Sequence, residues 1–246
     1  MSSQQPIKLA ILGASGRMGT QVAKLARPMS SGFEIVAEWS GGAALGDELQ
    51  AADVAIDFTP ATATDDIVAA LSGTTCALVS GTTGRSAQQT AAVEDQSATQ
   101  RVFLASNMSP VVHLLSMLVE QAARALPELD IEIAETHHHG KLDAPSGTAI
   151  TLGGAAARGR GVTQPEVRLR AGGARESGEI GFSVRRGGNV IGEHDVTMFG
   201  EFERLTLSHR AEDRSLFAAG ALRAAAWLID QPPGLYGMQD LLAGGD

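Results

Sequence analysis

The chain has 246 residues, of which 43% are hydrophobic and 19% charged, and its formal net charge is −9; we therefore expect a globular protein of one large or two small domains, without a broad nucleic-acid footprint. No apolar run approaches the ~20 residues of a membrane-spanning helix, and the N-terminus lacks the basic start and cleavage site of a signal peptide. The lone cysteine, Cys76, excludes an intrachain disulfide and a cysteine-based zinc cluster, so we expect a cytoplasmic location.

The first part of the chain predicts strands that alternate with helices. Apolar runs read as buried strands at residues 7–12, 33–39, 54–59, 76–84 and 101–109. Segments between them, such as TQVAKLA and TATDDIVAALS, have helical periodicity. Short apolar strands that alternate with helices predict an α/β fold with a Rossmann-like, doubly wound parallel sheet.

The pattern changes near residue 109. Residues 109–126 predict a long amphipathic helix. In residues 130–137 apolar and polar residues alternate, which predicts a strand with one solvent-exposed face. The segments EVRLRA, EIGFSVRRGGNVIGEHDVTMFG and ERLTLSHRA predict hairpin-linked strands, and helical character returns near residue 215. We therefore expect one domain of residues 1–108 and 215–246, and a second α+β domain of residues 109–214 with a mixed, largely antiparallel sheet.

A glycine turn joins the first strand to the first helix. Gly13, Gly16 and Gly19 would permit a tight turn and let a pyrophosphate approach the backbone, while the helix N-terminus supplies free N–H groups. A purely structural turn is the alternative, but the place of this turn in an alternating pattern favours dinucleotide binding. Arg17 is a candidate phosphate contact. The stretches SGTTG and ASNMS end the fourth and fifth strands, where ligands bind in open α/β sheets.

The most informative segment is ETHHHGKLDAPSGTA, residues 135–149. Successive residues of a strand point to opposite faces, so three adjacent histidines cannot all bind one metal ion, and Lys141 would place a cation beside that ion. A metal site completed by Glu135 and Asp143, and a solvated loop, remain alternatives. We favour a third interpretation, in which a helix N-terminus at 146–148 binds a carboxylate while a histidine and the lysine bind a second one or deliver a proton. The segment then predicts a site for a small dianionic substrate that is protonated as it is reduced.

Several motifs in order carry a resemblance to a known family: GASGRMG, IDFTP, SGTTG, SNMS, ETHHHGKLDAPSGTA and RRGGNVIGEH. The chain resembles the 4-hydroxy-tetrahydrodipicolinate reductase (dihydrodipicolinate reductase) family over nearly its whole length, and the histidine–lysine segment is the most specific motif. The resemblance implies hydride transfer from NADH or NADPH to a cyclic dicarboxylate in lysine and diaminopimelate biosynthesis. It also implies a dinucleotide-binding first domain, a substrate-binding second domain and a homotetramer formed through the sheet of that second domain.

The resemblance also implies roles for single residues. His137 and Lys141 correspond to the proton-handling pair, His138 to a substrate contact, and Gly147 and Thr148 to a carboxylate clamp. No metal ligand is implied. The implied cofactor shell comprises Gly13, Ala14, Ser15, Gly16, Arg17, Met18, Gly81, Thr82, Thr83, Ala105, Ser106, Asn107 and Met108.

The tip of the second strand bears on which nicotinamide cofactor is used. An acidic residue there binds the ribose hydroxyls of NAD, but Ser40 stands at the matching position and Glu38 should point the other way. Ser40 can itself donate to a phosphate, so we expect it to contact the cofactor. We therefore expect NADPH to serve at least as well as NADH. His139 and Gly140 stand where the family often has more basic or polar residues. Competing hypotheses are another NAD(P)-dependent reductase of aspartate-derived metabolism, a non-catalytic dinucleotide sensor and a histidine-rich metal protein.

Overall fold

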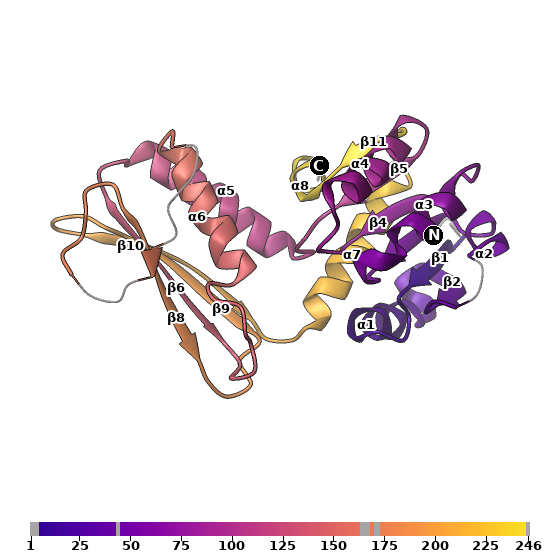
Figure 1. Ribbon diagram of the computed structural model, residues 1–246, viewed down its shortest axis with the longest axis horizontal. Helices are drawn as coiled ribbons and strands as arrows, with labels where there is room; N and C mark the ends of the chain where they lie inside the picture. Colours follow the sequence, from indigo (N-terminus) through magenta and orange to yellow (C-terminus); the bar gives the residue numbers. More distant parts are fainter. Residues whose placement is uncertain (1–4, 43–44, 163–167, 170–172, 245–246) are drawn as a thin grey trace. The chain divides into compact units, whose positions relative to one another are not determined.

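The computed structural model describes residues 5–42, 45–162, 168–169 and 173–244. The chain divides into two compact units (Figure 1): unit 1 comprises Met1–Ser109 with Ser215–Asp246, and unit 2 comprises Pro110–Arg214. The chain thus leaves unit 1 once and returns to it, so unit 2 is an insertion in unit 1. None of the described helices is long and apolar enough to cross a membrane.

Unit 1 is built on a six-stranded sheet in which every described pairing is parallel, with the strand order β11-β5-β4-β3-β1-β2. Every residue of β3 and β4 is buried, because helices cover both faces of the sheet. The predicted doubly wound parallel sheet is confirmed. Its strands are β1 (Ile7–Leu12), β2 (Phe33–Trp39), β3 (Val54–Asp57), β4 (Ala77–Ser80), β5 (Arg101–Leu104) and β11 (Gly234–Tyr236).

Two apolar clusters flank this sheet. On one face Leu9, Ile11 and Phe103 pack with residues of α1 (Arg17–Ala26), α7 (Ser215–Leu228) and α8 (Met238–Ala243). On the other face Leu12 and Leu78 pack with residues of α2 (Asp47–Gln50), α3 (Thr64–Leu71) and α4 (Ala87–Asp95), and with the fully buried Cys76. Short 3-10 turns η1 (Met29–Ser31), η2 (Ala61–Ala63) and η3 (Gln96–Ala98) complete the unit. Strand β11 and helices α2 and α8 were not predicted, because they are too short to show a periodic pattern in the sequence.

Unit 2 is a two-layer arrangement in which a pair of helices covers one face of a five-stranded mixed sheet (Figure 1). The core lies between the layers, where Leu115, Val119 and Leu152 of the helices meet Ile133 and Phe182 of the strands. The elements are α5 (Pro110–Ala125), β6 (Asp130–His137), α6 (Gly147–Gly159), β7 (Arg168–Leu169), β8 (Ile180–Arg186), β9 (Gly192–Phe199) and β10 (Arg204–Ala211).

The strand order of unit 2, β10-β9-β6-β8-β7, corrects one expectation. Strands β9 and β10 form the predicted antiparallel hairpin, but β8 and β9 do not pair, because β6 lies between them. Two strand spacings are about 10 Å, which the short connection at 187–191 spans easily. Of the expected strand at 166–171, only β7 lies within the described residues. This order places β8 and β9 on either side of the strand that ends in His137.

Candidate active site

The glycine turn of unit 1 has the geometry that a dinucleotide requires. Gly13 adopts the left-handed region with φ 83°, and a Cβ there would lie 2.9 Å from the carbonyl oxygen of Phe58. A Cβ on Gly19 would lie 2.1 Å from the carbonyl oxygen of Gly13, so only glycine lets α1 approach β1 this closely. Gly16 caps α1 with extended backbone, and the first N–H groups of the helix are left for a ligand.

The tip of β2 is joined to this turn. The Ser15 N–H donates to Ser40 Oγ at 2.9 Å, and the N–H groups of Gly13 and Ala14 donate to the carbonyl oxygen of Trp39. The structure therefore brings the predicted contacts Ser15 and Ser40 together. The carboxylate of Glu38 is instead bound by Arg27 at 2.8 Å. Arg17 is exposed, and a hollow of ≈ 440 Å³ lies beside the tip, lined by Trp39, Gly42, Leu45, Gly46, Asp66, Ala69 and Ala70.

A second hollow of unit 1, of ≈ 260 Å³, lies where β4 and β5 end. Thr82, Ala105 and Ser106, all in the predicted cofactor shell, line it together with Arg85. Gly81 is half-buried and Thr83 is exposed on the same loop, whereas Asn107 accepts a bond from the Ser109 N–H. Met108 is 2% exposed and its side chain packs in the core, as does the half-buried Met18, so these two residues offer a ligand mainly their backbone.

In unit 2 the predicted proton donor is held by a carboxylate. Glu135 and His137 are two residues apart on β6, so both point to the buried face of the sheet. His137 Nδ1 donates to Glu135 Oε2 at 2.6 Å, since a carboxylate oxygen can only accept. This bond leaves Nε2 as the nitrogen that can exchange a proton with a substrate. A Cβ on Gly192 would lie 3.0 Å from that Nε2, so the glycine keeps the space beside it open.

Glu135 is 1% exposed and is held by other donors as well. Two nitrogens of Arg186 donate to its two oxygens at 2.8 and 2.9 Å, and the Ser146 N–H donates at 3.0 Å. Burial raises the pKa of Glu135, but the bonds from Arg186, His137 and Ser146 outweigh burial and hold this pKa below its ordinary value. The carboxylate stays ionised, and it fixes the tautomer of His137.

Lys141 lies in the turn after β6 and binds a different carboxylate. Its Nζ donates to both oxygens of Asp143, at 2.8 and 2.7 Å. That hydrogen bond holds the pKa of Asp143 below its ordinary value. The side chain of Asp143 is 63% exposed, so another anion can take its place beside the lysine. No hydrogen bond among the described residues joins Lys141 directly to His137.

The predicted carboxylate clamp is the first turn of α6. Ser146 caps the helix by accepting from the Ala149 N–H at 3.2 Å, and its Oγ lies 3.0 Å from Nε2 of His194. Gly147 is exposed and Thr148 is half-buried at the helix start. The N-terminus of α6 and the ring of His137 thus both bind Glu135, so the helix start and the histidine of the predicted site lie close together.

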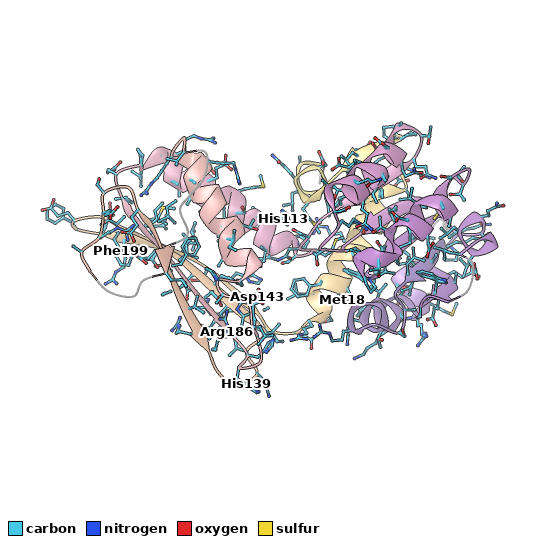
Figure 2. The ribbon with its side chains drawn as sticks, viewed as in Figure 1. Met18, His113, His139, Asp143, Arg186 and Phe199 are labelled. Carbon is cyan, nitrogen blue, oxygen red and sulfur yellow. The ribbon has the colours of Figure 1, made fainter. Side chains whose placement is uncertain are left out.

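The two other histidines of the triplet differ. His138 is half-buried, and partial desolvation followed by the nearby Arg214 guanidinium holds its pKa below the ordinary value. His139 is exposed and its Nδ1 donates to the carbonyl oxygen of Gly188 at 2.9 Å. Figure 2 shows Arg186 and Asp143 near one end of the unit-2 sheet, His139 on the turn beyond, and Phe199 at the other end. Within the described ranges, no three His, Cys, Asp or Glu side chains are grouped to hold a metal ion.

From the sequence, Glu135 was a candidate only as a metal ligand, and no role was predicted for Arg186 or His194. A signal was nevertheless present, because Glu135 is in phase with the core residues Ile131 and Ile133 of β6. A carboxylate on the core face of a strand must be paired, so this register itself predicts a buried ion pair. The identity of the partner could not be inferred from this pattern.

A glycine turn at the head of a parallel sheet, and a carboxylate-held imidazole beside a helix N-terminus, are the parts of a dinucleotide-dependent oxidoreductase. Comparison with known proteins agrees. The family models for the N-terminus and the C-terminus of dihydrodipicolinate reductase match residues 7–108 and 111–242, respectively. The chain belongs to the dihydrodipicolinate reductase family, whose enzymes are oxidoreductases of lysine and diaminopimelate biosynthesis that use NADH or NADPH.

Individual relatives match over nearly the whole chain. The 4-hydroxy-tetrahydrodipicolinate reductase of Caulobacter vibrioides is 49% identical, with 97% of this chain and 98% of that protein covered. The enzyme of the same name from Rhizobium rhizogenes is 45% identical, with 98% of each covered. Among solved structures, dipicolinate-bound dihydrodipicolinate reductase from Paenisporosarcina sp. TG-14 superposes with a TM-score of 0.75 at 26% identity, covering 96% of this chain and 99% of that one.

Proposed function

We propose that this chain reduces 4-hydroxy-tetrahydrodipicolinate to tetrahydrodipicolinate with NADPH or NADH, in the cytoplasm. The observation that carries the proposal is the Glu135–His137 pair, which lies on β6 next to the first turn of α6 and just before the Lys141 turn. The names of the relatives support the substrate. The net reaction takes up one hydride and one proton and releases one water molecule, so the site must bind an anion and handle a proton.

Unit 1 offers residues that fit the cofactor, which supplies the hydride when bound. The turn Gly13–Met18 would hold the pyrophosphate at the N-terminus of α1, and Ser40 would contact the adenosine ribose. The loops Gly81–Thr83 and Ala105–Met108 would hold the nicotinamide end beside the ≈ 260 Å³ hollow. The left-handed Gly13 and the close approach at Gly19 are the features of this chain that support the assignment.

His137 is the proposed proton donor. Glu135 orients the ring through Nδ1 and would stabilise the positive charge of the imidazolium form, so that Nε2 can carry and deliver the proton. Arg186 keeps Glu135 ionised and directed at the histidine. The ring is mostly buried beside Gly192, which limits competition by bulk water.

The substrate carboxylates would bind at two places. The N–H groups of Gly147 and Thr148 begin α6 and can hold one carboxylate, where the positive end of the helix dipole favours it. The substrate would displace Asp143 from Lys141, whose ammonium group would then serve with His137 in the proton transfer, and His138 would contact the second carboxylate from the adjoining turn. In this proposal Asp143 holds the ammonium group of Lys141 in place until the substrate binds, and Lys141 then changes partner.

A homotetramer formed through the unit-2 sheet is also part of the proposal. The second face of that sheet is left open by α5 and α6. Phe199, which points to this face at the end of β9, is 40% exposed, and Phe202, in the turn between β9 and β10, is 92% exposed. Burial of such residues between subunits is favourable. Light scattering on the purified protein checks the oligomeric state.

The decisive experiment is a coupled assay. Dihydrodipicolinate synthase generates the substrate in place, and oxidation of NADPH or NADH is followed, with aspartate semialdehyde alone as the control. Turnover is expected only with the complete mixture. Cofactor binding without turnover would favour the dinucleotide sensor, and turnover with aspartate semialdehyde would favour another reductase. Thermal stabilisation by pyridine-2,6-dicarboxylate tests the anion site independently of activity.

A further inference from the structure

The loop after β4 is tied to the end of β3. The Gly81 N–H donates to the carbonyl oxygen of Asp57 at 2.9 Å, and a Cβ on Gly81 would meet the ring of Phe58 at 2.3 Å. Thr82 Oγ1 lies 2.9 Å from both Asp57 Oδ2 and the carbonyl oxygen of Thr59. The Thr82 N–H also donates to Ser80 Oγ at 3.3 Å, so both the hydroxyl and the N–H of Thr82 hold the loop itself in place.

Asp57 is the centre of this arrangement and is 0% exposed. Its Oδ1 accepts from the N–H and the hydroxyl of Thr59 at 2.9 and 2.7 Å. Its Oδ2 accepts from Ser80 Oγ at 2.7 Å, from Thr82 Oγ1 at 2.9 Å and from Arg85 Nη2 at 2.9 Å. In the described part of the chain, Arg85 is the cation that balances this charge. Five donors on one buried carboxylate leave it little freedom to move.

Arg85 joins the same loop to a third segment. Its side chain is 8% exposed, and its Nε donates to Thr64 Oγ1 at the start of α3 at 3.1 Å. Its Nη2 donates to Ser80 Oγ at 2.7 Å in addition to Asp57. The same arginine lines the ≈ 260 Å³ hollow next to Thr82 and Ser106. Arg85 therefore lines the hollow that the proposed nicotinamide loop borders, and Asp57 joins this arginine to the Thr82 hydroxyl of the loop.

We propose that Asp57 and Arg85 are positioning residues for cofactor binding, which act through Thr82 to fix the backbone of Gly81–Thr83. This inference rests on the proposed function of that loop. A buried ion pair is a weak source of stability, because the desolvation of two charges offsets their attraction. It does impose one geometry on the groups that it binds, since every hydrogen bond of the network must be satisfied at once. Here those groups are the hydroxyls of Ser80 and Thr82, which hold the loop after β4 in its conformation.

The test measures cofactor affinity apart from turnover. Arg85→Met leaves the Asp57 charge unbalanced, and the dissociation constant for NADPH, measured by nicotinamide fluorescence without substrate, should rise about tenfold or more, the equivalent of one lost charge-assisted hydrogen bond. The KM for the dicarboxylate substrate should change far less, because that site belongs to unit 2. The double variant Asp57→Asn with Arg85→Met removes both charges and should recover part of the affinity.

Arg101→Met is the matched control. Arg101 begins β5 at the opposite end of the sheet and donates to the carbonyl oxygens of Thr75 and Ile229, so its loss weakens unit 1 without touching the loop. It should lower the thermal midpoint and leave the NADPH dissociation constant within about twofold, as expected for a site far from the cofactor loop.

The outcomes are distinct. An Arg85→Met protein that loses thermal stability but binds NADPH like the wild type would reduce the pair to a structural element and overturn the inference. If that variant does not fold, Arg85→Lys keeps the charge and loses the bridge to Thr64, and it should weaken NADPH binding by a smaller factor; unchanged affinity in this variant would equally overturn the inference. Wild-type protein that binds no NADPH would instead reject the proposed function.

Discussion

Each unit buries one carboxylate at or near the end of a central strand, and the two carboxylates have different partners. Asp57 of unit 1 accepts from the hydroxyls of Thr59, Ser80 and Thr82 and from Arg85. Glu135 of unit 2 accepts from Arg186, from the Ser146 N–H and from the ring of His137. In both cases one arginine balances the negative charge, and hydrogen bonds from other polar groups satisfy the carboxylate oxygens, as a buried charge requires.

Because their partners differ, the two buried carboxylates can serve two different functions. Hydroxyl groups and guanidinium do not titrate near neutral pH, so the network around Asp57 only holds backbone segments in place. The ring of His137 can instead exchange a proton at Nε2, because Glu135 binds its Nδ1 and fixes the tautomer and orientation of the ring. A buried carboxylate with hydroxyl partners therefore indicates positioning, and one with a histidine partner indicates proton handling.

The largest expected effect is on the proton-handling side of this comparison. Lys141→Ala should lower kcat by ~10²–10⁴, the usual contribution of a positioned acid or base, while NADPH binding stays near the wild-type value. His137→Gln should have a similar effect, and the double variant should lose less than the product of the two. Lys24→Ala, an exposed lysine of α1, is the control. Parallel losses of kcat and NADPH affinity would contradict a role for Lys141 in the chemistry.

Glu135→Gln tests whether the unit-2 carboxylate also holds the fold. The change leaves the guanidinium of Arg186 unbalanced, so the free energy of unfolding of unit 2 should fall by ~3–5 kcal/mol. Glu132→Gln, on the opposite face of β6 and paired with Arg175, should cost clearly less, because the Glu132 side chain is 25% exposed and that of Glu135 only 1%. Trp39, Trp227 and Tyr236 all belong to unit 1, so unit 2 must be followed by hydrogen exchange or circular dichroism. If Glu135→Gln and Glu132→Gln lower the free energy of unfolding equally, the buried carboxylate has no special role in the stability of unit 2.

Acidification should destabilise unit 2 before unit 1. Burial, followed by the neighbouring His137 and His209, lowers the pKa of His194 from 6.5 to about 4. The unfolded chain binds a proton as the pH falls through 6.5 and the folded chain does not until about 4, so stability is full above that window and is lost within it. The loss is at most roughly 3 kcal/mol. Hydrogen exchange of β9 between pH 7 and 4.5 measures it, and His194→Gln should flatten the dependence; a wild-type profile in that variant would assign the loss to other groups.

The smallest expected effect concerns the cofactor side. Ser40 carries no negative charge at the tip of β2, Glu38 is bound by Arg27, and Arg17 is exposed at the turn. We expect kcat/KM for NADPH to equal or exceed that for NADH by less than ~10-fold, about 1.4 kcal/mol. Arg17→Ala should weaken NADPH more than NADH, and added salt should reduce the difference. A preference for NADH above ~10-fold would mean that Glu38 turns into the site.

How far the sequence could predict these features depends on the distance along the chain between partners. The segment 135–149 placed His137, Lys141 and the start of α6 correctly in the fold, because their relation is local. Arg186 lies 51 residues from Glu135 and Arg85 lies 28 residues from Asp57, and no local pattern links such pairs. The insertion of β6 between β8 and β9 was missed for the same reason, since adjacent strands favour a hairpin unless a distant strand competes.

The assignment of Met108 to the cofactor shell shows a second limit. Its position after β5 is correct, but its side chain lies in the core with 2% exposure. A motif specifies the position of the backbone, whereas the direction of a side chain in an irregular loop follows from packing. Thr82 is a similar case, because its hydroxyl turns inward to Asp57.

The insertion of unit 2 between β5 and α7 has a consequence for protein synthesis. The core of unit 1 needs Ala221 and Leu228 of α7, and its sheet needs β11, but about a hundred residues of unit 2 leave the ribosome before them. At about 5–20 residues per second, the first five strands wait on the order of 5–20 s with an apolar face uncovered. Unit 2 is continuous and can complete its core during that interval. Translation thus supplies all of the inserted unit before it supplies the last segment of the enclosing unit.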